Sequence, residues 1–127
     1  MVVDTSALIA VVKADPGHEA IRDCLKVAHG AAMSAATWTE CLIVAQERNV
    51  ADLLREIVGQ TPIEIVPHDA ALADLAAEAH RAWGKGNHPA ALTIGDCFAY
   101  ALARARDLPL LYVGADFAKT DVRSALG

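Results

Sequence analysis

The chain opens with the stretch that decides its fold, Met1-Val2-Val3-Asp4-Thr5-Ser6-Ala7-Leu8. The pattern predicts a short buried strand, then an acid and two hydroxyl residues, then an apolar helix. Ligands of open α/β sheets bind just beyond the carboxyl ends of the strands, and Asp4 follows the first strand directly. Asp4 is therefore either a functional acid at a sheet edge or the N-cap of the helix that follows.

Short apolar strands alternate with helices along the rest of the chain. The predicted strands are residues 1–3, 31–34, 63–66 and 110–113. The predicted helices cover residues 6–13, 16–28, 37–48, 50–58, 70–83 and 93–106. Asp15 and Asn49 are the expected caps of the second and fourth of these helices, and His68-Asp69 leads into the fifth. Such alternation is typical of βαβ units, so we expect an α/β fold with a short parallel sheet between two helical layers.

Length, charge and cysteine content narrow the classes of protein. The 127 residues fit one domain, expected to be residues 1–127. A net charge of −5 argues against broad, charge-driven binding to nucleic acid, but it is compatible with an acidic site that handles phosphate through a cation. Three cysteines without a CxxC spacing predict no disulfide framework or zinc site. With no secretory leader and no apolar run of membrane-spanning length, we expect a cytoplasmic protein without membrane contact.

Three further acids stand at junctions comparable to that of Asp4, namely Glu40, Asp96 and Asp116. In a parallel sheet the strand carboxyl ends share one edge, so these acids can converge there. Two carboxylates about 5 Å apart repel each other by roughly 3 kcal/mol at an effective dielectric constant of about 20. A divalent cation relieves this repulsion, and carboxylates with water suit magnesium or manganese. Such an ion can activate a water molecule for attack on a phosphodiester.

Each acid also has a purely structural interpretation. Glu40 and Asp96 each stand three residues after a threonine, which is capping-box spacing. Asp116 could be a turn acid after Gly114. Thr5 and Ser6 are predicted to cap the first helix or to orient the acids, and Ser6 is a candidate partner of a metal-bound water.

Several stretches resemble PIN-domain ribonucleases, in particular the VapC toxins of bacterial type II toxin–antitoxin pairs. The resemblance lies in residues 3–8, 34–40, 84–90, 95–101 and 110–122, and it spans almost the whole chain in order. It implies a PIN-like α/β/α fold and an RNA endonuclease that depends on Mg²⁺ or Mn²⁺. The residues that would hold the metal are Asp4, Glu40, Asp96 and Asp116. It further implies a homodimer and a cognate VapB-like antitoxin, whose C-terminal segment occupies the groove.

Two positions depart from the family pattern. Ala115 stands where a second polar or acidic residue often neighbours the closing aspartate, so both one-metal and two-metal sites stay open. Asn87 stands where many relatives carry arginine. Lys85 and His88, in the same glycine-containing loop, are candidate contacts for the RNA backbone, and a solvated loop is the equal alternative.

Other functions fit less well. A phosphatase of the haloacid-dehalogenase type needs a second aspartate two residues after Asp4, where Ser6 stands. A receiver domain needs an extra acid pair near the first strand and a lysine after the last strand, and neither is evident in this sequence. The main alternative to an RNA endonuclease is therefore a non-catalytic PIN-like module that binds a partner protein.

Overall fold

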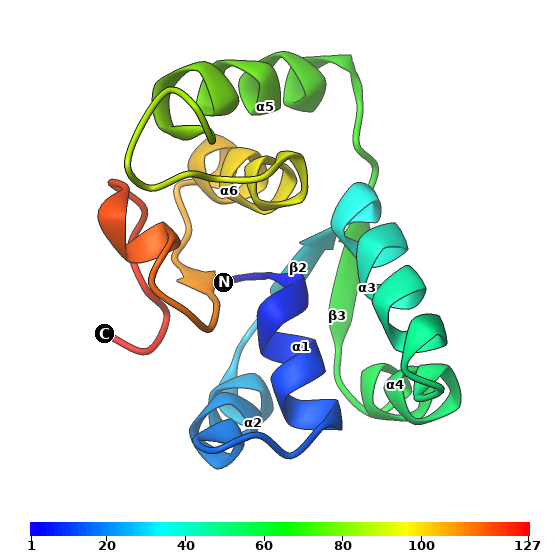
Figure 1. Ribbon diagram of the computed structural model, residues 1–127. Coiled ribbons are helices and arrows are strands. Elements are labelled where there is room, and N and C mark those ends of the chain that lie inside the picture. The colour runs from blue at the N-terminus through cyan, green and yellow to red at the C-terminus, as the bar shows by residue number, and fades with distance from the viewer.

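Four short strands form one parallel sheet in the order β3-β2-β1-β4 (Figure 1). The computed structural model describes all residues, 1–127. The strands are β1 (Val2–Val3), β2 (Ala31–Ser34), β3 (Ile63–Val66) and β4 (Leu110–Leu111). Val2 pairs with Ala32 on one side and with Leu110 on the other. Ser124 forms an isolated parallel bridge to Leu110, so the C-terminal segment covers the β4 edge of the sheet.

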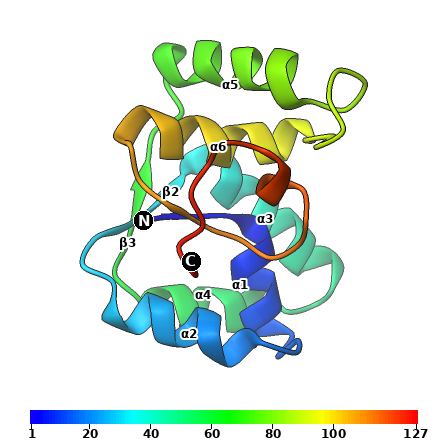
Figure 2. The same cartoon turned by 90° about the vertical axis from the view of Figure 1, so that its left-hand side faces the viewer.

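Helices cover both faces of this sheet. They are α1 (Thr5–Val12), α2 (His18–Val27), α3 (Ala35–Glu47), α4 (Ala51–Gly59), α5 (Ala70–Trp83) and α6 (Ile94–Arg106), followed by a 3₁₀ turn, η1 (Phe117–Lys119). Figures 1 and 2 show α1 to α4 on one side of the sheet and α6 on the other, with α5 outside α6. Successive strand side chains alternate between the two faces. Val3 and Met33 pack with α1 to α4, whereas Val2 and Leu110 pack with α5 and α6. The predicted α/β/α arrangement is confirmed.

The strand order creates a crevice at one position along the sheet edge. From β1 the chain moves outward to β2 and β3, and later returns to the other side of β1 as β4. The carboxyl ends of β1 and β4 therefore lie at a topological switch point, where ligands of open α/β sheets bind. Asp4 follows β1 directly, and its N–H donates to the Leu111 carbonyl oxygen of β4 (3.0 Å). None of the helices has the length and apolar character needed to cross a bilayer.

Two predicted helix caps are wrong. Asp15 does not cap α2, because the chain turns at Gly17 (φ +87°), and the helix begins only at His18. Asn49 does not cap α4: it adopts a left-handed conformation (φ +58°) that ends the preceding turn, and Val50 takes the cap position without a side-chain bond. Helix α5 is capped by Asp69, whose side chain accepts from the Leu72 N–H (2.9 Å).

Candidate active site

A cavity of about 350 Å³ opens at the switch point, and six of its ten lining residues are polar. Three of the four predicted acids line it: Asp4 from the end of β1, Glu40 from α3 and Asp96 from α6. The two predicted hydroxyl residues, Thr5 and Ser6, line it as well. The structure thus brings together five of the predicted residues from three separate parts of the chain.

Asp4 is the most buried of the acids, with 3% of its surface exposed. Its Oδ2 atom accepts hydrogen bonds from the Ser6 hydroxyl (2.6 Å) and the Ser6 N–H (3.1 Å). Its Oδ1 atom is buried and has no hydrogen-bond partner. The pKa of Asp4 is raised to about 6: burial is the largest cause, the hydrogen bonds from Ser6 oppose it, and the charges of Asp96 and Glu40 add to it. An unpaired, buried carboxylate oxygen beside two more acids is a position that a cation would satisfy.

Glu40 is held by two neighbours in the cavity wall. The Thr5 hydroxyl donates to its Oε1 atom (3.0 Å), which links the start of α1 to α3. Gly95, in the first turn of α6, lies against its carboxylate so closely that a Cβ atom there would collide with it. The carboxylate therefore occupies space that only a glycine at position 95 leaves free.

The capping interpretation of Glu40 is wrong. Helix α3 begins at Ala35, with Ser34 as its N-cap, and the Ser34 hydroxyl oxygen accepts from the Ala36 N–H (3.2 Å). Thr37 is consequently inside the helix, and its buried hydroxyl has no hydrogen-bond partner. Glu40 thus has no part in capping α3, and its only hydrogen bond comes from Thr5.

Asp96 caps its helix, as predicted, and also lines the cavity. The Thr93 N–H donates to Asp96 Oδ2 (3.0 Å), and the Asp96 N–H donates to the Thr93 hydroxyl oxygen (3.2 Å), which completes a capping box. These bonds use one carboxylate oxygen and leave the other available at the cavity. The capping box therefore fixes Asp96 where α6 starts beside the sheet edge.

Ser6 links the chain just beyond β1 to the chain just beyond β4. Its hydroxyl donates to Asp4 and accepts from the Val113 N–H (3.0 Å). Strand β4 ends at Leu111, opposite the last residue of β1, and not at Val113 as predicted; the Val113 N–H bonds to a side chain instead. Asp15 also lines the cavity, which the sequence did not predict. The turn between α1 and α2 brings it there, with Ala14 in a left-handed conformation (φ +53°).

Three predicted residues lie outside the cavity wall. Asp116 is exposed before η1, and its side chain makes no capping bond there. Lys85 is exposed, and His88 serves its own loop: its Nδ1 atom accepts from the Ala90 N–H (2.9 Å), and its ring packs edge-on against Trp83 (4.7 Å between centroids). Contacts of Lys85 and His88 with RNA, and of Asp116 with a metal, stay predictions.

The donor chemistry of the cavity fits a hard divalent cation. The structure contains no group of three or more His, Cys, Asp or Glu side chains arranged to hold a metal ion. The cavity nevertheless offers carboxylate and hydroxyl oxygens and no sulfur or imidazole, which is the donor set of magnesium or manganese. The unpaired Asp4 Oδ1 atom is the specific feature that such an ion would satisfy.

Comparison with known proteins identifies the relatives of this fold. Residues 1–123 match the family model described as the PIN domain. The chain is 36% identical to the VapC ribonuclease Mb2780c of Mycobacterium bovis, over 98% of each chain. It is 38% identical to Ribonuclease VapC30 of Mycobacterium tuberculosis, over 96% of this chain and 95% of that protein.

Two solved structures share the fold at low sequence identity. One is Mycobacterium tuberculosis VapC20, described as a sarcin–ricin loop cleaving toxin, with a TM-score of 0.76 and 17% identity over 95% of each chain. The other is a toxin–antitoxin complex from Klebsiella pneumoniae, with a TM-score of 0.70 and 20% identity over 94% of this chain and 92% of that one. At these identities the likeness establishes the fold.

Proposed function

The chain belongs to the PIN domain family, among the VapC ribonucleases, and from this premise we propose that it is a metal-dependent endoribonuclease, the toxin of a type II toxin–antitoxin pair. The observation that carries the proposal is the cavity at the β1–β4 switch point. Three carboxylates line it, and one buried Asp4 oxygen has no partner. A purely structural cluster of acids would leave that oxygen and the mutual repulsion uncompensated.

Magnesium or manganese is the proposed cofactor. Asp4, Glu40 and Asp96 would hold it, with Asp116 as a fourth acid. A bound divalent cation there would neutralise charge on the scissile phosphate and make a water molecule acidic enough to act as the nucleophile.

The chain's own residues prepare this site. Ser6 holds one oxygen of Asp4 and leaves the other free, and Thr5 orients Glu40 through a single hydrogen bond. The capping box fixes Asp96 at the start of α6. Because the wall is acidic and the whole chain carries a net charge of −5, RNA should approach the cavity productively only when a cation is present.

The proposed partner, besides RNA, is a VapB-like antitoxin. The support is the similarity to proteins named VapC and the likeness of the fold to a chain of a toxin–antitoxin complex. A homodimer is proposed from the family resemblance. The cytoplasm is the proposed compartment, in keeping with three cysteines that are all free thiols.

An RNA cleavage assay on the purified chain tests the proposal. We expect cleavage with Mg²⁺ or Mn²⁺ and none with EDTA. Asp4→Asn and Asp96→Asn should each lower the rate more than about 100-fold, beyond the 10–100-fold effect typical of residues that only orient a metal ligand. The matched control is Arg106→Gln, which cuts an exposed ion pair with Glu64 (3.2 Å) at the opposite end of α6 and should leave cleavage unchanged.

Two outcomes would contradict the proposal. Cleavage that persists in EDTA would exclude a required divalent cation. A chain that cleaves no RNA with either cation, yet pairs tightly with a co-expressed antitoxin, would favour a non-catalytic partner-binding module.

A further inference from the structure

The segment after β4 forms a closed excursion from the sheet. The chain leaves after Leu111 and returns beside the same strand, where the Leu110 N–H donates to the Arg123 carbonyl oxygen (2.8 Å) and the Ala125 N–H donates to the Leu110 carbonyl oxygen (2.9 Å). We call residues 112–119 the Asp116 loop. Both ends of the excursion are thus fixed to β4, and the Asp116 loop lies between them.

Asp116 depends on this loop for its position. Its side chain is exposed and forms no hydrogen bond or ion pair of its own. The next residue, Phe117, is buried at 3% exposure in the core beneath α6. The Thr120 hydroxyl donates to the Phe117 carbonyl oxygen (2.7 Å), which closes the turn. Where Asp116 stands is therefore determined by what holds the backbone on either side of it.

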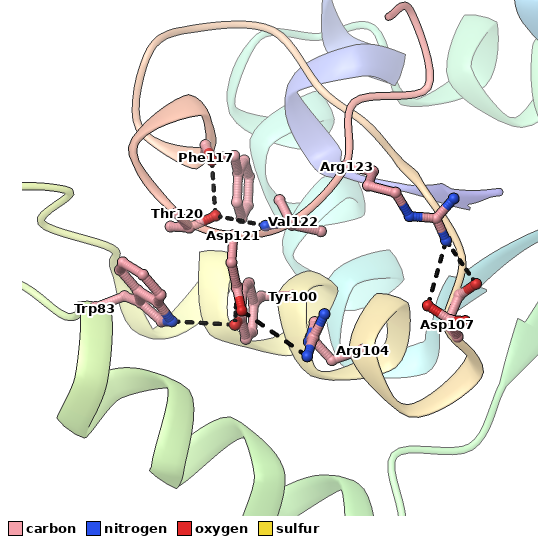
Figure 3. Close-up of polar contacts among 9 residues, drawn as sticks. All are labelled: Trp83, Tyr100, Arg104, Asp107, Phe117, Thr120, Asp121, Val122 and Arg123. Carbon is pink, nitrogen blue, oxygen red and sulfur yellow. Dashed lines mark hydrogen bonds and ion pairs between the residues drawn. The ribbon is translucent and has the colours of Figure 1, made fainter.

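A chain of hydrogen bonds holds the C-terminal side of the loop (Figure 3). The Trp83 indole N–H of α5 donates to the Tyr100 hydroxyl oxygen of α6 (3.0 Å), and that hydroxyl donates to Asp121 Oδ1 (2.5 Å). Arg104 of α6 lies 3.8 Å from Asp121 Oδ2. Tyr100 is 7% exposed, whereas the Asp121 side chain is 49% exposed. A half-exposed carboxylate thus ends a chain of contacts that starts in the helical layer.

The N-terminal side of the same loop contacts the cavity. The Val113 N–H donates to the Ser6 hydroxyl, which in turn donates to Asp4 Oδ2. The Asp116 loop therefore contacts the proposed cation site through Val113, at its N-terminal end. Asp121, just beyond its C-terminal end, is bonded to Tyr100 of α6.

We propose that Asp121, held by Tyr100, is a positioning residue for the cation site: it fixes the Asp116 loop, which keeps Val113 bonded to Ser6 and sets where Asp116, the proposed fourth acid, stands. The inference rests on the proposed function. The pKa of Tyr100 is raised to about 12, mainly by burial and next by the hydrogen bond to Asp121. Its hydroxyl is therefore protonated near neutral pH and remains a donor.

Mn²⁺ binding, followed by isothermal titration calorimetry, is the main test. Asp121→Ala should raise the Mn²⁺ dissociation constant about tenfold, the loss typical of one hydrogen bond to a charged group, and Asp121→Asn, which keeps an acceptor oxygen, should recover most of it. Amide hydrogen exchange should accelerate in residues 112–119 of the Asp121→Ala protein. The matched control is Arg123→Gln, which cuts a different tie of the same segment, to Asp107 (2.8 Å to its carbonyl oxygen), and should leave Mn²⁺ binding unchanged.

A double-mutant cycle separates positioning from general destabilisation. If Asp121 acts through the Asp116 loop, a protein that carries both Asp116→Asn and Ser6→Ala should already have lost the effect, and adding Asp121→Ala should raise the dissociation constant no further. Additive effects, or an equal loss in Arg123→Gln, would overturn the proposal, because they would indicate weakened folding alone. If Asp121→Ala does not fold, Tyr100→Phe cuts the same bond from the other side.

Failure of this inference is distinguishable from failure of the proposed function. Suppose that the wild-type protein cleaves RNA, and that Asp121→Ala changes neither Mn²⁺ binding nor hydrogen exchange in the Asp116 loop. That result would overturn the positioning role of Asp121 and would not contradict the proposed ribonuclease activity. A wild-type chain that cleaves no RNA would overturn the ribonuclease, and the exchange and Mn²⁺ data would still decide the role of Asp121.

Discussion

Replacing Asp4 with asparagine should stabilise the metal-free protein near neutral pH. Burial raises the pKa of Asp4 from 3.8 to about 6, so folding favours the neutral acid. A group whose pKa is higher in the folded state contributes stability that is complete below the unfolded pKa and is lost as the pH rises through the folded pKa. The stabilising contribution of Asp4 is therefore present below about pH 4 and absent above about pH 6. At neutral pH the ionised carboxylate is a cost to the fold.

The size of this effect follows from the pKa shift and from the contacts of the side chain. A shift of about two units corresponds to about 3 kcal/mol between low and neutral pH. Asparagine can still accept both Ser6 hydrogen bonds, but its amide nitrogen replaces the unpaired Oδ1 atom and costs about 1–3 kcal/mol wherever it finds no acceptor. We therefore expect a net stabilisation of about 1 kcal/mol at neutral pH, or a rise in Tm of about 4 °C for a chain of this length.

Thermal melts of the two proteins, with EDTA and with Mn²⁺, measure the effect. In EDTA, the difference in Tm between Asp4→Asn and wild type should be largest near pH 8 and should shrink toward pH 4, because only wild type gains a proton at Asp4 over this range. Mn²⁺ should raise the Tm of wild type and leave Asp4→Asn unchanged. A variant that is less stable than wild type in EDTA near pH 8, or one that Mn²⁺ stabilises equally, would refute the reasoning.

Three further predictions concern the cavity wall and the buried thiols. Gly95→Ala adds a Cβ atom where the Glu40 carboxylate lies, so we expect Mn²⁺ binding to weaken at least about tenfold in calorimetry, although alanine favours a helix by about 1 kcal/mol over glycine. Thr5→Val removes the only hydrogen bond to Glu40 and should weaken Mn²⁺ binding about three- to tenfold with little change in Tm. Burial raises the pKa of Cys41 to about 12 and that of Cys97 to about 11, so iodoacetamide near pH 8 should leave both thiols unmodified until the protein is unfolded, as mass spectrometry would show.

The sequence predicted the placement of Asp4 because its signal is both local and topological. A β-branched strand followed by an acid and a helix occupies only a few residues, and parallel order puts all such junctions at one sheet edge. The sequence also predicted that Glu40 lies at the carboxyl edge of the sheet, but it predicted the wrong start for the helix that carries Glu40. The spacing from Thr37 imitates a capping box, yet the helix starts as soon as β2 ends, where Ser34 is an equally good cap. Local spacing cannot decide between two competent caps three residues apart.

The remaining features of the site depend on contacts that no local pattern encodes. Asp15 lines the cavity from the turn between α1 and α2, in which Ala14 and Gly17 are both left-handed. Asp116 follows a strand, as predicted, but it lies outside the cavity wall and its side chain makes no capping bond. Its neighbours are the residues that are held: Phe117 is buried, and Asp121 accepts from Tyr100 of α6. Contacts of this kind join residues far apart in sequence, and single-sequence patterns do not carry that information.

The structural and the functional interpretations of the acids turn out to be compatible, and the geometry gives the reason. Asp4 caps α1 through Oδ2 and leaves Oδ1 free, and Asp96 completes a capping box through one oxygen and retains the other. A helix N-terminus attracts a carboxylate and holds it by backbone N–H groups. Capping therefore places each acid rigidly at the sheet edge while using half of its capacity as an acceptor. Glu40 has no such support and relies on Thr5 and on the space left by Gly95. The fold thus supplies two preplaced carboxylates as a consequence of starting helices at this edge, and the third requires residues that serve it alone.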